Sequence, residues 1–135
     1  MSKKIVVIPC SGIGKAYGEI CRQAVYNVVE NMRPKNACTT CLARVMIDDP
    51  ETLNLINNNY VITVEGCTKE CSKTNIEKKG KTVDATFRTI DEFKEHHDLK
   101  PEGVLKIGEP GMQLANYLSQ KIADEVDLLS AKEGE

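Results

Sequence analysis

The chain carries six cysteines, and five of them stand at or near the ends of predicted strands and helices. A cysteine thiolate can bind a soft metal ion or act as a nucleophile, so these positions are the first candidates for chemistry. The segment 64–71 is the clearest, because Gly66 and Cys67 form a turn between an apolar run and a helical run that includes Cys71. On a helix, the i, i+4 spacing of the two cysteines puts both sulfurs on one face, one turn apart. This segment therefore predicts a site for a metal or for thiol chemistry.

A second cysteine pair, Cys38-Thr39-Thr40-Cys41, has the C-x-x-C spacing that zinc knuckles and redox dithiols use. Cys10 follows an aliphatic run, and Cys21 lies inside a predicted helix, where a small buried residue is the ordinary interpretation. The six cysteines are Cys10, Cys21, Cys38, Cys41, Cys67 and Cys71.

The cellular compartment decides how cysteines are interpreted. No apolar run approaches the roughly 20 residues that span a bilayer, and the basic-then-apolar start at 3–9 is too short for a signal peptide. We therefore expect a cytoplasmic protein with no membrane partner. In a reducing cytoplasm, structural disulfides are disfavoured, and clustered cysteines are more often metal ligands or redox thiols.

Composition limits the class of protein further. The 135 residues fit one domain, 1–135, and we expect the polar tail at 130–135 to be frayed. Hydrophobic residues make up 41% of the chain and charged residues 28%, which are ordinary values for a globular protein. The net charge of −2 comes with mixed signs and no basic face, so we expect no nucleic-acid partner.

The cysteines must be positioned by regular elements, which the hydrophobic pattern predicts. Aliphatic runs at 4–9 and 60–65 are typical of buried parallel strands, and the alternating segment 81–88 predicts a half-exposed strand at the sheet edge. Helical periodicity or capping residues mark segments at 14–31, 41–47, 49–59 and 70–79, a short helix from 89, and a last helix from 108. Alternating strands and helices predict an α/β fold in three layers, with a small, mostly parallel sheet and helices on both faces.

In such sheets, ligands bind in the crevice beyond the carboxyl ends of the strands. Cys10 and Cys67 each follow a buried strand, and Cys41 and Cys71 each begin a helix, so we expect a crevice lined by cysteines. A helix N-terminus stabilises a thiolate, the form that binds metal or attacks. Four thiolates suit tetrahedral zinc, with sulfur about 2.3 Å from the metal, and an iron–sulfur cluster also fits this soft donor set. The spacing alone does not choose between them.

Near Cys10, the sequence partly matches two known motifs, a dinucleotide-binding turn and a phosphatase loop, but it lacks a required residue of each. The glycines at 12, 14 and 18 follow a strand, but the third is one position late for the dinucleotide pattern G-x-G-x-x-G. A phosphatase loop would need arginine six positions after Cys10, where Ala16 stands.

The chain has two histidines, His96 and His97, which are adjacent in the sequence. We interpret them as a surface pair at a helix C-terminus.

Four short motifs then resemble one known family, and they follow one another in order. They are Pro9-Cys10-Ser11-Gly12, Cys41-Leu42-Ala43, Glu65-Gly66-Cys67-x-x-x-Cys71 and Ile76-Glu77-x-x-Gly80. This pattern, over residues 4–80, resembles the DGC-domain family, with Glu65 in place of the aspartate in the Asp-Gly-Cys motif. The resemblance implies a zinc-binding α/β domain whose four cysteines map onto Cys10, Cys41, Cys67 and Cys71. Cys38 lies outside the pattern and is a possible extra thiol.

Three functions stay open at this point. The leading hypothesis is a metal-binding protein with zinc on Cys10, Cys41, Cys67 and Cys71, in which Glu65 is a helix-start carboxylate or supports the ligands. Lys15 or Lys69 would offset the negative charge of a four-thiolate site. The second hypothesis is a thiol redox or sulfur-transfer enzyme with Cys10 or Cys67 as nucleophile. The third is a partner-binding module in which any metal stabilises the fold.

Overall fold

The computed structural model describes residues 4–10, 15–66, 69–103 and 106–133. Within them, four parallel strands form one sheet in the order β2-β1-β3-β4, which confirms the predicted α/β fold. The elements are β1 (Ile5–Pro9), α1 (Ala16–Tyr26), the π-helix η1 (Asn27–Met32), β2 (Ala37–Cys38), α2 (Leu42–Met46), α3 (Pro50–Asn57), β3 (Tyr60–Glu65), α4 (Cys71–Lys78), β4 (Ala85–Arg88), α5 (Thr89–Glu95) and α6 (Gly108–Glu133).

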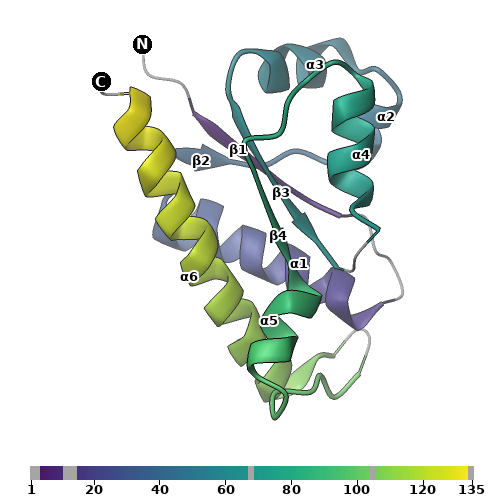
Figure 1. The fold of residues 1–135 in the computed structure, drawn as a ribbon, viewed down its shortest axis with the longest axis vertical. Helices are drawn as coiled ribbons and strands as arrows, with labels where there is room; N and C mark the ends of the chain where they lie inside the picture. The colour runs from purple at the N-terminus through teal and green to yellow at the C-terminus, as the bar shows by residue number, and fades with distance from the viewer. Residues whose placement is uncertain (1–3, 11–14, 67–68, 104–105, 134–135) are drawn as a thin grey trace.

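The sheet forms the middle of three layers because successive residues of a strand point to opposite faces. Ile5 and Val7 of β1 pack in the apolar cluster shared with α1 and α6. Val6 and Ile8 pack in the cluster formed with α2, α3 and α4. Figure 1 shows the long helix α6 beside α1, with α2, α3 and α4 grouped away from them. The predicted helices on both faces are therefore present.

The two central strands end together at the edge where the cysteines were expected. β1 and β3 pair in parallel from Ile5 opposite Tyr60 to Pro9 opposite Val64. The pairing continues one residue further, because the Cys10 N–H donates to the carbonyl oxygen of Val64 at 2.8 Å. The residue after β1 is thus held against the end of β3.

Helix α6 covers one face of the sheet through the apolar stripe that its sequence predicted. Its buried residues Leu114, Leu118, Ile122, Val126 and Leu129 recur at helical spacing. The helix continues to Glu133 and so includes the first residues of the segment 130–135, whose fraying stays a prediction. Leu129 anchors this last turn in the core, so the polar residues after it extend the helix along the surface.

Three other elements differ from the sequence prediction. The helical segment after Tyr26 continues as a π-helix, closed by the N–H of Arg33 on the carbonyl of Val28 at 2.7 Å. The edge strand β4 begins at Ala85, because the Asp84 carboxylate and main-chain N–H are already bonded to Val61. The two-residue strand β2 was not predicted, since two residues carry no periodic signal.

No helix among the described residues combines the length and the apolar character needed to cross a bilayer.

Candidate functional site

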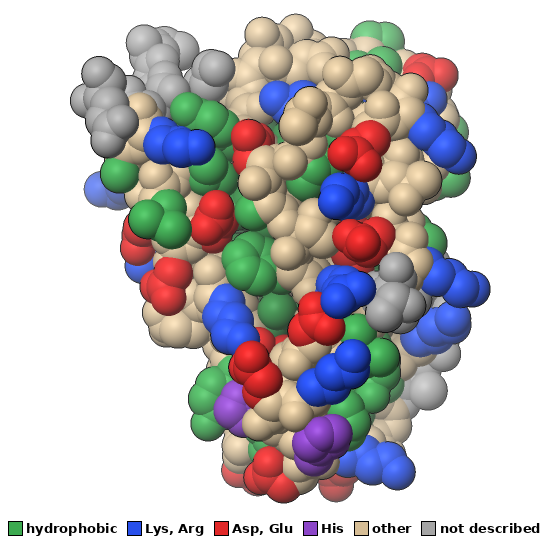
Figure 2. All heavy atoms as spheres, viewed as in Figure 1, with side chains coloured by type: hydrophobic (Ala, Val, Ile, Leu, Met, Phe, Trp, Pro, Cys, Tyr) green, Lys and Arg blue, Asp and Glu red, His purple; other side chains and the backbone are tan. Residues whose placement is uncertain are grey.

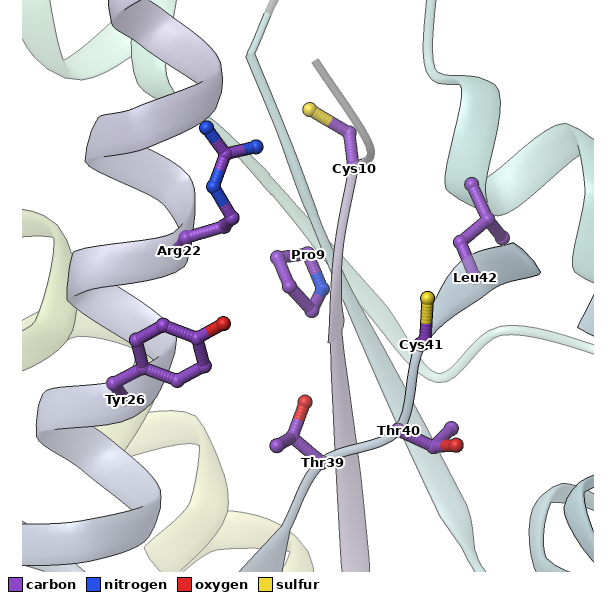
Figure 3. Close-up of a pocket in the computed structure, with 8 residues that line it drawn as sticks. All are labelled: Pro9, Cys10, Arg22, Tyr26, Thr39, Thr40, Cys41 and Leu42. Carbon is purple, nitrogen blue, oxygen red and sulfur yellow. The ribbon is translucent and has the colours of Figure 1, made fainter. Parts of the chain in front are cut away.

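A pocket of about 480 Å³ lies beyond the carboxyl end of β1. Its lining residues are Pro9, Cys10, Arg22, Tyr26, Thr39, Thr40, Cys41 and Leu42. In Figure 3, Arg22 and Tyr26 project from α1 on one side, and the segment from Thr39 to Leu42 closes the other. Pro9 and Cys10 lie between the two sides. Two of the four cysteines expected to share a crevice, Cys10 and Cys41, therefore line one pocket.

Main-chain hydrogen bonds hold Cys10 in place at the end of β1. Its side chain is buried, and its Sγ accepts a hydrogen bond from the N–H of Gly66 at 3.2 Å. A Cβ at residue 66 would lie 3.4 Å from this sulfur and 3.3 Å from the main-chain nitrogen of Gly18. Glycine thus lets the two segments approach closely enough for the N–H to reach the sulfur. Such a donor stabilises the negative charge that a thiolate carries.

A second thiol, Cys21, lies beside Cys10 in the core. It is fully buried on α1, and its Sγ lies 3.1 Å from the hydroxyl oxygen of Thr89. Burial raises the pKa of the Cys21 thiol well above its ordinary value, and the neighbouring Cys10 thiol adds to that rise. Cys21 is therefore kept as a neutral thiol at neutral pH. The sequence prediction of a small buried residue is consistent with this, but its position beside Cys10 was not foreseen.

The other cysteines occupy three different environments. Cys41 is exposed and immediately precedes α2, whereas Cys71 is exposed and is the first residue of α4. Cys38 is half-buried against the cluster that contains Val6, and burial raises the pKa of its thiol. Cys67 lies outside the described residues. None of the five described cysteines is in a disulfide bond.

The described thiols do not form a closed cage. Within the ranges that the structure covers, no three cysteine sulfurs lie within 4.8 Å of one another. Cys10 and Cys41 share the pocket, while Cys71 lies at the start of a helix that follows the neighbouring strand β3. The sequence prediction that all four cysteines join one site stays a prediction.

Glu65 has the role of a helix-start carboxylate, one of the two that its position suggested. It is the last residue of β3 and only 1% exposed. Its Oε1 accepts from the N–H of Ser72 at 3.1 Å and its Oε2 from the N–H of Lys73 at 3.0 Å. These are two of the N–H groups that the first turn of α4 leaves without helical partners. The carboxylate therefore ties the start of α4 to the end of the strand.

Helix α4 begins later than its sequence suggested. Glu70, the residue before it, adopts a left-handed backbone conformation with φ of 51°, which a right-handed helix cannot include. Cys71 is consequently the first residue of α4, in agreement with the prediction that it begins a helix. The i, i+4 argument for Cys67 and Cys71 requires a helix that includes Glu70, so the structure removes this support for a shared helical face, and Cys67 itself lies outside the described residues.

Arg22 and Tyr26 are site residues that the sequence analysis missed. They lie four residues apart on α1, so they share one face of that helix. The guanidinium of Arg22 bonds the Glu19 carboxylate at 2.8 and 3.2 Å, and in Figure 3 it extends from α1 toward the Cys10 side of the pocket. The helical spacing was a usable signal, because Arg22 and Tyr26 are one helical turn apart on the helix that follows Cys10 in the sequence. Lys15 and Lys69, which were expected to offset thiolate charge, are both exposed.

The comparisons with known proteins give one result. A family model described as the DGC domain matches residues 6–109, which is more than half of the chain. The match extends beyond residue 80, where the motif resemblance ended, and includes β4 and α5. No curated protein and no solved structure matches the chain.

Proposed function

Because the chain belongs to the DGC domain family, we propose that it is a zinc-binding protein whose ligands are Cys10, Cys41, Cys67 and Cys71. The observation that carries the proposal is the pocket beyond β1, where Cys10 and Cys41 line one space and the Gly66 N–H donates to the Cys10 sulfur. Main-chain donors of this kind support thiolate ligands, which bind zinc as anions.

The residues present fit this metal by their donor chemistry. Thiolates are soft ligands that zinc accepts in sets of four. Cys41 immediately precedes α2, Cys71 is the first residue of α4, and both are exposed, so packing does not hold their side chains away from a common ligand. Zinc held by four thiolates has no open coordination position, and it would stabilise the fold rather than activate a water.

The charge of such a site supports a role for Arg22. Four thiolates around one divalent ion leave a net negative charge, which needs a cation or N–H donors nearby. Arg22 lines the pocket with Cys10 and Cys41, whereas the lysines first considered are exposed. The N–H of Gly66 supplies a further donor at the Cys10 sulfur. Both groups belong to elements that pack against the end of β1.

The test is metal content against single cysteine replacements. The protein is purified anaerobically, its zinc is measured by mass spectrometry, and its free thiols are titrated in denaturant. Cys10→Ser, Cys41→Ser, Cys67→Ser and Cys71→Ser are each expected to lose about one equivalent of zinc and to lower the melting temperature together with it. Cys38→Ser is the matched control, because Cys38 packs in the core and does not line the pocket. Full zinc content in all four variants would exclude the proposal.

A second candidate function, thiol redox or sulfur-transfer chemistry at Cys10, is favoured by one observation. The Cys10 sulfur has both a main-chain N–H donor and a neighbouring thiol, Cys21. With a disulfide such as oxidised glutathione, the Cys10 thiolate would attack one sulfur and release the other as a thiolate. A second cysteine thiol would then displace the remaining glutathione thiolate and leave an internal disulfide.

Mass spectrometry after limited exposure to oxidised glutathione tests this second candidate. Enzymatic thiol chemistry predicts one rapidly formed disulfide that includes Cys10, and a Cys10→Ser variant that stays folded while losing it. Equal, slow reaction of all exposed thiols, with Cys10 unmodified, would exclude it. Cys67, the other nucleophile considered, is replaced by serine in parallel.

A further inference from the structure

Away from the cysteines, the C-terminal end of α5 and the next residue, His96, bring three potential metal ligands together. One ligand atom from each of Glu92, Glu95 and His96 lies within 4.8 Å of the other two. The Glu92 side chain is only 3% exposed, and its Oε1 is buried without a hydrogen-bond partner. A buried carboxylate oxygen without a hydrogen bond is unfavourable, and a bound cation would remove this cost.

The distance between Glu92 and His96 is informative. The Nε2 of His96 lies 3.4 Å from the Oε1 of Glu92, which is longer than the roughly 2.7–3.2 Å of an N–H···O hydrogen bond. Two ligands that are each about 2.1 Å from a tetrahedral metal are separated by about 3.4 Å. We propose that Glu92, Glu95 and His96 form a second divalent-cation site, suited to Zn²⁺ and independent of the cysteines.

Local structure holds the imidazole in position for this role. Glu92 and His96 are four residues apart, which puts them on the same side of the helix end. The His96 ring stacks on the Tyr117 ring of α6, with ring centres 4.1 Å apart and an angle of 9° between the planes. This contact fixes the plane of the ring whose Nε2 lies near Glu92. One imidazole nitrogen and two carboxylates form a donor set that suits zinc and similar transition metals better than calcium or magnesium.

Lys121 of α6 is the competing cation. Its Nζ lies 2.7 Å from the Oε2 of Glu92 and 2.8 Å from the Oε2 of Glu95. It therefore neutralises one of the two carboxylate charges and leaves the Oε1 of Glu92 without a hydrogen bond. Its side chain is 44% exposed, so the ammonium can move into water when a divalent ion binds Glu95. Figure 2 shows both histidines at the lower end of the molecule, where acidic and basic side chains gather.

Zinc titration of the reduced, metal-free full chain, followed by calorimetry, tests the site. Wild-type protein is expected to bind one more equivalent than His96→Ala, and Glu95→Gln is expected to show the same loss. His97→Ala is the matched control, because His97 is the adjacent, exposed histidine. Lys121→Met is expected to bind the additional zinc about tenfold more tightly, since it removes the competing ion pairs.

Cobalt distinguishes this site from the cysteines. Co²⁺ held by nitrogen and oxygen ligands lacks the strong sulfur-to-cobalt charge-transfer absorption of a thiolate site. The equivalent that depends on His96 is therefore expected to add no such absorption and to persist in Cys10→Ser protein, whether or not the cysteines bind zinc. Equal zinc stoichiometry in wild type and His96→Ala would overturn the proposal. An equal loss in His97→Ala would also overturn it, because that loss would not be specific to the cluster.

Discussion

Replacing Glu65 with glutamine tests how the end of β3 controls the start of α4. The substitution keeps the size of the side chain but removes its charge. One amide oxygen can still accept a main-chain N–H, whereas the amide NH₂ group faces the other N–H donor to donor. Glu65→Gln is therefore expected to leave one of the two N–H groups, Ser72 or Lys73, without a partner in a buried environment.

The expected magnitude follows from these contacts. A hydrogen bond to a charged group contributes about 1.5–3 kcal/mol, and an unsatisfied buried N–H costs about 1–3 kcal/mol. The carboxylate also interacts favourably with the positive end of the helix, whereas the neutral amide is less costly to bury. We expect the free energy of unfolding to fall by about 2 kcal/mol. With a urea m-value of about 2 kcal/mol/M, the unfolding midpoint shifts down by about 1 M.

Urea unfolding followed by circular dichroism measures this change, and amide hydrogen exchange locates it. Exchange at Ser72 and Lys73 is expected to accelerate more than exchange in α6. Glu77→Gln is the control, since Glu77 is exposed on the same helix, and its free energy of unfolding is expected to stay within about 0.5 kcal/mol of wild type. If Glu65→Gln and Glu77→Gln unfold at the same urea concentration, the carboxylate does not hold α4 as described.

Two further predictions concern the neighbourhood of Cys10. Gly66→Ala is expected to lower stability by about 1–3 kcal/mol and to weaken zinc retention, because its Cβ would lie 3.3–3.4 Å from main chain and from the Cys10 sulfur. Cys21→Ser is expected to flatten the loss of stability at alkaline pH. The raised pKa keeps Cys21 protonated in the folded state, while the unfolded thiol ionises above about pH 8.5, so wild-type stability falls by up to about 1.4 kcal/mol per pH unit above that value.

Each of these two predictions has a decisive outcome. For Gly66→Ala, unfolding and zinc measurements that both match wild type would show that the close approach at residue 66 is unimportant. Gly80→Ala is the informative comparison, since its Cβ would meet no atom within 4 Å and only its φ of 84° is unfavourable for alanine. For Cys21→Ser, parallel stability curves between about pH 8.5 and 10 would contradict the role assigned to burial.

Local hydrophobic pattern predicted most of the fold. The aliphatic runs of β1 and β3 and the apolar stripe of α6 were identified because each element buries one side and the required spacing is visible within a few residues. β2 escaped prediction because its two residues pair only when the edge of β1 is available. The start of α4 was misplaced because its cap comes from Glu65, beyond the local helix signals.

The candidate site could be predicted only in part, for a related reason. Cys10 and Cys41 were identified because each stands at the end of an element that the sequence itself marks. Cys21 and Arg22 were missed as site residues, because their position depends on how α1 is rotated when it packs on the sheet. That rotation results from contacts with β1 and α6, which no local window contains.

The sequence by itself determined the family, the α/β class and the positions of the thiols, because motif order, hydrophobic period and residue type are properties of short segments. Tertiary structure alone decided which of these groups lie in contact. It brought the Gly66 N–H to the Cys10 sulfur and the Glu65 carboxylate to α4, and it buried Glu92 between α5 and α6. These contacts depend on strand register and helix rotation, which are set by packing across the whole core.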